Sequence, residues 1–258
     1  MQKLRIKNRD GKEIAVLLEG EENTNGLAFV MHGLGGFKEQ PHVETFAHSF
    51  LEKDFVVVRF DTRDTFGESE GNYEQATITS YLADLEDVIA WAKSQPWYQE
   101  PFTLAGHSLG GICTALYAER HPEQVIALAP ISTVVSGELS AEAKTETNEL
   151  AKWQETGWRE TPSKSKSGII KRLPWSHMED RMKYDLLPGV SRLTMPTLLI
   201  VGSVDDTTPP KHQKILLDAL PGPKELHIIE GAPHTFRNPA HLKEIADIFA
   251  HWIDSWQA

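Results

Sequence analysis

The most informative segment of the chain is Phe102-Thr103-Leu104-Ala105-Gly106-His107-Ser108-Leu109-Gly110. Residues 102–105 form an apolar run typical of a buried strand, and a helical pattern over 110–120 follows. Between them, Gly106-His107-Ser108-Leu109-Gly110 matches G-x-S-x-G, in which a serine occupies a sharp strand-to-helix turn. Glycines permit the strained turn, and the helix N-terminus favours negative charge beside Ser108. The pattern predicts a nucleophilic serine, and the alternative is an ordinary N-cap.

Strand-like and helical patterns alternate along the rest of the chain. Short apolar runs, which fit strands buried on both faces, occur at 27–31, 55–60, 102–105, 125–128, 197–201 and 225–229, after an early strand at 13–18. Amphipathic helical patterns occur at 79–94, 110–120, 211–220 and about 240–256. This alternation implies βαβ units with right-handed crossovers. We therefore predict an α/β fold with a doubly wound, mostly parallel sheet of about eight strands.

One long polar stretch, residues 132–191, interrupts this alternation. It contains Trp153, Trp158 and Trp175, which are three of the seven tryptophans. A structureless loop of this length is improbable inside a domain, and disordered segments are usually poor in aromatic residues. We therefore predict a small inserted cap of short helices at 132–191 over a core formed by 1–131 and 192–258. The alternative is a partly disordered excursion.

Composition excludes several classes of protein. The 258 residues suit one large domain, and 26 Lys and Arg against 37 Asp and Glu give a net charge of −11. This balance argues against nucleic acid or membrane partners and implies mild repulsion of anionic substrates. Neither a membrane-length apolar run nor an apolar leader segment is visible, so we expect a cytoplasmic protein. The single cysteine, Cys113, excludes an internal disulfide and a cysteine-rich metal site.

A serine hydroxyl needs a base, and the base needs a group that orients it. His234 lies in Gly231-Ala232-Pro233-His234, directly after a predicted strand, where ligands bind in open α/β sheets. The strand at 197–201 is followed by Asp205 and Asp206, and either carboxylate could accept a hydrogen bond from the imidazole. One of the two aspartates is instead explained by an Asx turn or a helix N-cap.

Acyl transfer also needs donors for the oxyanion, usually two backbone N–H groups. One donor is expected from Leu109, the residue after the serine. The other is expected from the loop His32-Gly33-Leu34-Gly35-Gly36, and we assign it to Leu34, with His32 as a packing residue beneath the loop. A plain glycine-rich turn is the alternative. The chain lacks both the phosphate-loop and the dinucleotide-binding patterns, so we predict no cofactor and no metal.

Together these motifs resemble the α/β-hydrolase superfamily over essentially the whole chain. The acid of that family commonly lies three residues after a strand-end glycine and four before a proline, and Asp205 fits this frame between Gly202 and Pro209. Within the superfamily the chain is similar to small bacterial carboxylesterases of the feruloyl or cinnamoyl type, which carry a modest cap. One departure is Asp64, which stands where relatives often have a glycine.

The resemblance implies a serine esterase that cleaves short-chain or aryl esters of small molecules. Its triad would be Ser108, Asp205 and His234, and the protein would be a monomer or homodimer. Trp153, Trp158 and Trp175 are expected either to line an apolar acyl pocket or to anchor the cap. The alternatives are an acylglycerol lipase, a thioesterase, a carbon–carbon bond hydrolase, a cofactor-free haloperoxidase or a non-catalytic ligand receptor.

Overall fold

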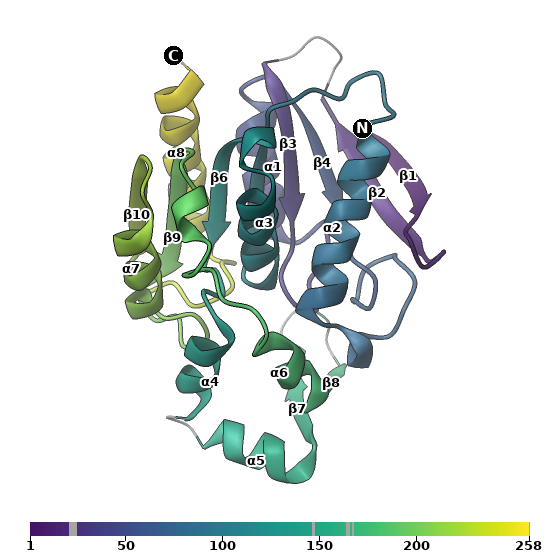
Figure 1. Ribbon diagram of the computed structural model, residues 1–258, viewed down its shortest axis with the longest axis vertical. Helices are drawn as coiled ribbons and strands as arrows, with labels where there is room; N and C mark the ends of the chain where they lie inside the picture. The colour runs from purple at the N-terminus through teal and green to yellow at the C-terminus, as the bar shows by residue number, and fades with distance from the viewer. Residues whose placement is uncertain (21–24, 146–147, 164–165, 167, 258) are drawn as a thin grey trace.

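The predicted apolar runs form a single mixed sheet at the centre of the structure. The computed structural model describes residues 1–20, 25–145, 148–163, 166 and 168–257, and its strands pair in the order β1-β2-β4-β3-β5-β6-β9-β10 (Figure 1). The strands are β1 (Gln2–Lys7), β2 (Glu13–Glu19), β3 (Gly26–Met31), β4 (Phe55–Phe60), β5 (Phe102–His107), β6 (Val125–Ile131), β9 (Thr197–Gly202) and β10 (Lys224–Ile229). The β1–β2 and β2–β4 pairs are antiparallel and the others are parallel. The predicted mostly parallel α/β class is confirmed.

Helices cover both faces of the sheet, as a doubly wound fold requires. They are α1 (Pro41–Leu51), α2 (Ile78–Ala92), α3 (Leu109–Arg120), α7 (Pro210–Ala219) and α8 (Pro239–Gln257). Buried side chains of α2 and α3 share one apolar cluster with the sheet, whereas those of α1 and α8 share another. On the second face, Phe249 of α8 stacks on Phe46 of α1 with their ring centroids 5.1 Å apart. Among the described residues, no helix combines the length and apolarity needed to cross a bilayer.

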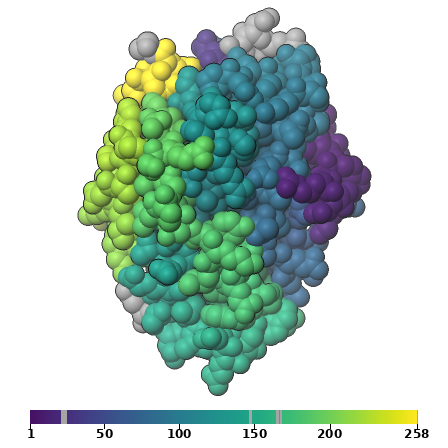
Figure 2. All heavy atoms as spheres, viewed as in Figure 1, coloured from purple at the N-terminus to yellow at the C-terminus, as the bar shows by residue number. Residues whose placement is uncertain are grey.

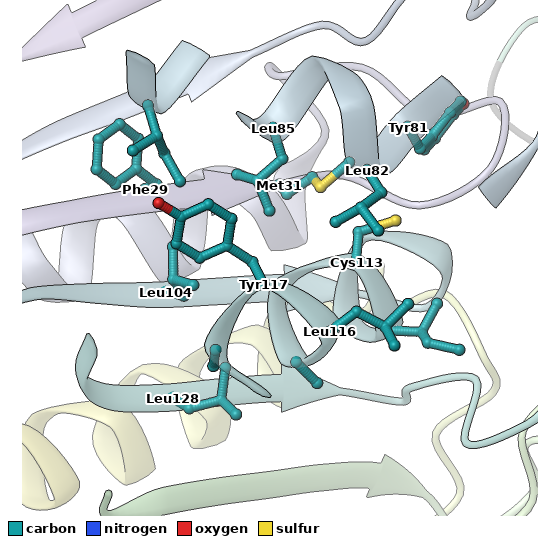
Figure 3. Close-up of a cluster of buried hydrophobic side chains, with 14 of the residues drawn as sticks. Phe29, Met31, Tyr81, Leu82, Leu85, Leu104, Cys113, Leu116, Tyr117 and Leu128 are labelled. Atoms are coloured by element: carbon teal, nitrogen blue, oxygen red, sulfur yellow. The ribbon is translucent and has the colours of Figure 1, made fainter. Parts of the chain in front are cut away.

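The larger apolar cluster fixes β5, the strand that leads to Ser108. Figure 3 shows Leu82 and Leu85 of α2 and Leu116 of α3 around Met31 of β3 and Leu104 of β5. All five side chains are buried. Because β5 lies between β3 and β6 with helices on both sides, its carboxyl end is held by packing from every direction.

Three elements differ from the sequence-based expectation. Two of them were not expected: β1, an edge strand whose Leu4 and Ile6 alternate with exposed cationic residues, and α1, which begins at Pro41. The third is β10, which was expected to be buried on both faces but is largely half-exposed. The reason is its position at the edge of the sheet, where it has only β9 as a neighbour.

Asp64, the departure from the family pattern, occupies a left-handed backbone conformation with φ of 60°. Glycine adopts this region readily, and aspartate is one of the few other residues that tolerate it. The Asp64 carboxylate accepts a hydrogen bond from the backbone N–H of Asn72 at 2.8 Å, and Lys12 Nζ lies 3.4 Å away. The substitution therefore keeps the turn that a glycine would make and adds a hydrogen bond across the loop.

The chain between β6 and β9 packs at the carboxyl end of the sheet. It contains α4 (Gly137–Thr145), α5 (Glu149–Thr156), β7 (Trp158–Pro162), β8 (Ile170–Pro174) and α6 (Ser176–Arg181). Short helices were expected here, but the antiparallel β7–β8 hairpin was not, because its strands show little apolar alternation. His177 Nδ1 lies 2.6 Å from the Ala76 carbonyl oxygen, and Asp180 accepts hydrogen bonds from Thr79, so α6 is fastened to the start of α2. Figure 2 shows these segments covering the lower end of the molecule.

One buried carboxyl group of α3 has no role in the site described below. Glu119 is 8% exposed, and its Oε1 has no hydrogen-bond partner among the described residues. Burial, followed by the charge of Asp185, raises the pKa of Glu119 to about 8, although Arg120 and Arg192 act in the opposite direction. Folding therefore disfavours ionisation of this carboxyl group.

Glu119→Gln should stabilise the protein at high pH only. The Glu119 carboxyl ionises near its ordinary pKa of 4.5 in the unfolded chain and near 8 in the folded protein. Its contribution to the free energy of unfolding is therefore fully present below pH 4.5. That contribution is lost as the pH rises through the higher value. We expect urea unfolding to show Glu119→Gln more stable than the parent at about pH 8 and little different at about pH 4. The exposed Glu123→Gln is the matched control, and a pH-independent difference for Glu119→Gln would contradict the prediction.

Candidate active site

Ser108 lies at the sharp turn between β5 and α3. Its φ of 56° and ψ of −112° form a strained conformation for a residue with a side chain. The turn also needs its glycines, because a Cβ at Gly106 would lie 2.4 Å from the Gly110 carbonyl oxygen and one at Gly110 would lie 2.5 Å from that of His32. The Ser108 side chain makes no N-cap hydrogen bond, so the N-cap alternative does not describe this serine.

The structure brings Ser108, His234 and Asp205 together in one chain of hydrogen bonds. Ser108 Oγ lies 2.9 Å from His234 Nε2, and His234 Nδ1 lies 2.8 Å from Asp205 Oδ2. With the imidazole proton on Nδ1, the serine hydroxyl donates to Nε2 and Nδ1 donates to the carboxylate. This is the geometry of a nucleophile, a base and a group that orients the base.

The two loops that carry the acid and the histidine are tied to each other. The backbone N–H of Val204 donates to the Ala232 carbonyl oxygen at 3.2 Å, and that of Gly231 donates to Ser203 Oγ at 2.8 Å. A Cβ at Gly202 would lie 2.0 Å from the Ala232 carbonyl oxygen. The end of β9 therefore needs a glycine so that the histidine loop can approach closely.

Asp205 both shapes its own loop and faces the imidazole. Its Oδ1 accepts hydrogen bonds from the backbone N–H groups of Thr207 and Thr208, at 2.8 and 2.9 Å. Burial alone would raise the pKa of Asp205, but His234 and these two N–H groups together hold it well below its usual range. Asp206 is exposed and accepts from the Thr207 hydroxyl at 3.2 Å. The Asx-turn and triad interpretations, which the sequence posed as alternatives, both describe Asp205.

Two residues beside the triad were missed by the sequence analysis. His107, the residue before the nucleophile, has its Nε2 2.8 Å from the carbonyl oxygen of His234, and burial lowers the pKa of His107 to about 3. The neutral ring therefore donates from Nε2 and holds the histidine loop. The Thr208 hydroxyl lies 2.9 Å from both Asp205 Oδ2 and the Ser132 carbonyl oxygen, so it can donate to only one of them at a time. For His107, its place inside the G-x-S-x-G motif was the available signal.

The two predicted oxyanion donors belong to segments that both lie next to Ser108. Leu109 is the first residue of α3, so its N–H belongs to the first turn, where amides have no acceptor within the helix. Leu34 lines the same pocket as Ser108, and a Cβ at the neighbouring Gly33 would lie 3.0 Å from Ser108 Cβ. His32 is buried beneath this loop, where Nδ1 donates to the Gly33 carbonyl oxygen at 2.7 Å and Nε2 accepts from the backbone of Thr62 at 3.1 Å. It therefore supports the loop.

A pocket of about 660 Å³ opens above Ser108. Loops of the core and the segment between β6 and β9 both contribute to its lining. Among the described lining residues are five cations, Lys144, Arg159, Lys171, Arg181 and Arg237, and two carboxylates, Glu149 and Asp206. The pocket is thus polar and carries an excess of positive charge. The described residues contain no group of three or more His, Cys, Asp or Glu side chains that could hold a metal ion.

The three tryptophans of residues 132–191 are not among the residues that line this pocket. Trp153 is buried, donates from Nε1 to the Leu173 carbonyl oxygen at 3.1 Å, and meets Trp175 edge to face at 5.8 Å. Trp158 is 38% exposed, and the Arg172 guanidinium lies 4.5 Å from its ring centroid. The pocket above Ser108 is therefore not the aryl pocket expected from these residues. Trp153 and Trp158 line a separate pocket of about 430 Å³, and Trp153 and Trp175 belong to one small apolar cluster.

Comparisons with known proteins agree with this fold. A curated relative, the "Uncharacterized 31.7 kDa protein in traX-finO intergenic region" of Escherichia coli, is 24% identical, over 88% of this chain and 90% of that protein. The mouse "Palmitoyl-protein thioesterase ABHD10, mitochondrial" is 24% identical, over 78% of this chain and 65% of that protein. Among solved structures, Est1E from Butyrivibrio proteoclasticus with ferulic acid bound gives a TM-score of 0.81 at 21% identity, over 98% of both chains.

The family model described as serine aminopeptidase, S33, matches residues 22–187, which is more than half of the chain. The predicted resemblance to the α/β-hydrolases is therefore confirmed. The matched region includes the oxyanion loop, the nucleophile turn and the segment after β6. This protein belongs to the serine aminopeptidase S33 family of α/β-hydrolases.

Proposed function

We propose that this protein hydrolyses carboxylic esters of small molecules through an acyl-enzyme formed on Ser108. The observation that carries the proposal is the hydrogen-bonded chain from Ser108 Oγ through His234 to Asp205, with distances of 2.9 and 2.8 Å. Ser108, at one end of this hydrogen-bonded chain, lines a pocket large enough for a small organic molecule. A strained serine aligned with an imidazole and a buried carboxylate is the arrangement that acyl transfer uses.

In the first half of the reaction, Ser108 Oγ attacks the ester carbonyl carbon and His234 Nε2 takes the hydroxyl proton. Asp205 keeps the other imidazole proton on Nδ1 and stabilises the imidazolium that forms. The N–H groups of Leu34 and Leu109 donate to the oxyanion. The carbon–oxygen bond to the alcohol then breaks, and the alcohol leaves with the proton from His234 Nε2.

In the second half, a water molecule takes the place of the alcohol. His234 accepts a proton from this water as its oxygen attacks the acyl carbon, and the same two N–H groups hold the second oxyanion. Collapse of the intermediate releases the carboxylic acid and returns the proton to Ser108 Oγ. Residues 132–191 are proposed to act as the cap that limits which substrates reach this centre.

The charge of the pocket favours ester hydrolysis over the aminopeptidase activity that gives the family its name. An aminopeptidase must hold the ammonium group of its substrate, and carboxylates are the natural partners for that group. Here cations outnumber carboxylates in the described lining. A thioester is the second candidate, because the mouse relative is named a palmitoyl-protein thioesterase and the same triad serves both leaving groups.

Ser108→Ala should abolish ester hydrolysis while leaving the protein folded. The substrates are p-nitrophenyl esters from acetate to palmitate, methyl ferulate, the mono-p-nitrophenyl ester of adipic acid and a palmitoyl thioester. We expect a fall in kcat of about a thousandfold to a millionfold, because removal of the nucleophile leaves only binding and oxyanion stabilisation. Circular dichroism and thermal unfolding check that the variant is folded. Hydrolysis by neither parent nor variant, with both folded, would disprove the proposed function.

Asp205→Asn should impair catalysis far more than Asp206→Asn. An asparagine at 205 still accepts the backbone hydrogen bonds of its loop but presents an amide to His234 Nδ1, which favours the wrong imidazole tautomer. We expect kcat to fall about 10³- to 10⁴-fold for Asp205→Asn. For the neighbouring Asp206→Asn, the loss should be a few-fold at most. Equal losses in the two variants would show that Asp205 does not orient the base.

A further inference from the structure

The inserted segment contributes an unusual group of charges to the pocket above Ser108. Each of four of its elements places one cation in the lining: Lys144 from α4, Arg159 from β7, Lys171 from β8 and Arg181 from α6. The chain as a whole carries a charge of −11. The expectation that this charge repels anionic substrates therefore does not hold locally, because the pocket has the opposite sign.

Arg181 is the most deeply placed of these cations. It is 5% exposed, its NH1 donates to Ser140 Oγ at 2.7 Å, and its NH2 lies 2.9 Å from His177 Nε2. Its Nε is buried and has no hydrogen-bond partner among the described residues. The two groups that it contacts are neutral, since burial lowers the pKa of His177 to about 3. A buried guanidinium with an unused donor is costly unless an anion meets it.

The charges around Lys144 give the same indication. This side chain is 6% exposed, and burial, followed by the charges of Arg181 and Arg159, lowers the pKa of Lys144 to about 7. Glu149 and Asp206 act in the opposite direction but do not offset these effects. Glu149 is itself ion-paired with Arg159. The cations therefore repel one another, and a bound anion would relieve that repulsion.

A cation that serves only to hold the fold looks different. Arg172 lies next to Lys171 on β8 but does not line the pocket. Its Nε donates to Glu160 at 2.8 Å, and its guanidinium covers the Trp158 ring. It is thus paired with both a carboxylate and an aromatic face. Arg181 and Lys144 differ because they are buried and face the cavity.

We propose that the pocket binds an ester that carries a second, free carboxylate group, and that Arg181 and Lys144 hold this carboxylate while Ser108 attacks the ester. The inference rests on the proposed function and names its substrate class. The guanidinium of Arg181 and the ammonium of Lys144, which both line the pocket, supply the positive charge that attracts this carboxylate. Binding would also keep Lys144 protonated, because a neighbouring anion favours its charged form.

Two pairs of substrates test this proposal, each differing only in the charge of one group. For the acyl side, the mono-p-nitrophenyl ester of adipic acid is compared with its uncharged methyl ester. For the alcohol side, 4-carboxyphenyl butyrate is compared with its methyl ester. We expect kcat/KM for the anionic member to exceed that of the neutral one by about tenfold or more in at least one pair, mainly through a lower KM.

Variants of the pocket should change this ratio. Arg181→Gln and Lys144→Gln should each reduce the anionic-to-neutral ratio of kcat/KM by about tenfold. Arg172→Gln removes one positive charge from the same segment between β6 and β9 but outside the pocket, and its ratio should stay that of the parent. General damage to the fold lowers both members of a pair together, so the ratio reports on charge recognition. A ratio unchanged in both pocket variants would overturn the assignment.

A binding measurement keeps the proposal testable if the Gln variants do not fold. Titration of the Ser108→Ala protein with adipate and with hexanoate, followed by calorimetry, should show about tenfold tighter binding of the diacid. Neutral and anionic esters that are hydrolysed equally well in both pairs would overturn this inference and leave the proposed function standing. Failure to hydrolyse any ester would overturn the proposed function itself.

Discussion

The turn at Ser108 is the constraint on which the site depends. A residue with a side chain is held at a φ of 56°, and it stays there because the chain on either side is packed too closely to relax. Gly106 and Gly110 face each other across the turn, and Gly110 also rests against carbonyl oxygens of Met31 and His32 at the end of β3. The strain at Ser108 is therefore offset by the packing of β3, β5 and α3, whose buried side chains belong to the larger apolar cluster.

Around this fixed point, hydrogen bonds hold three loops in place. His32 supports the loop at 32–36, backbone hydrogen bonds to Asp205 support the loop after β9, and His107 supports the loop after β10. Burial keeps His107 neutral, so its single N–H is committed to the carbonyl oxygen of His234. Each of these hydrogen bonds fixes either a loop backbone or the carboxylate of Asp205. Together they keep Ser108, His234 and Asp205 in contact although the three residues follow different strands.

The electrostatics of the molecule are divided between surface and pocket. Most acidic side chains lie outside the cavity, whereas its described lining holds more cations than carboxylates. Four of these cations come from the segment between β6 and β9, whose Trp153 and Trp175 pack in its apolar cluster. The segment between β6 and β9 thus contributes positive charge to the pocket, while its apolar residues pack together in a small cluster of their own.

The sequence by itself determined the α/β class, the parallel strands, the turn at Ser108 and the positions of His234 and Asp205. These features are local: an apolar run of a given length and a motif at a strand end depend on neighbouring residues alone. The sequence alone also showed that Asp64 departs from the glycine that relatives often have. Its left-handed φ is a conformation that aspartate tolerates better than most residues.

Only the tertiary structure decided which distant side chains come into contact. The β7–β8 hairpin, the role of the tryptophans and the partnership of His107 with His234 all depend on contacts between residues far apart in the chain. The cations of the pocket lie on four separate elements, so no local pattern marks them as a group. Net charge is a sum over the whole chain and carries no information about position. The placement of charge beside Ser108 therefore emerges only when those elements fold over the sheet.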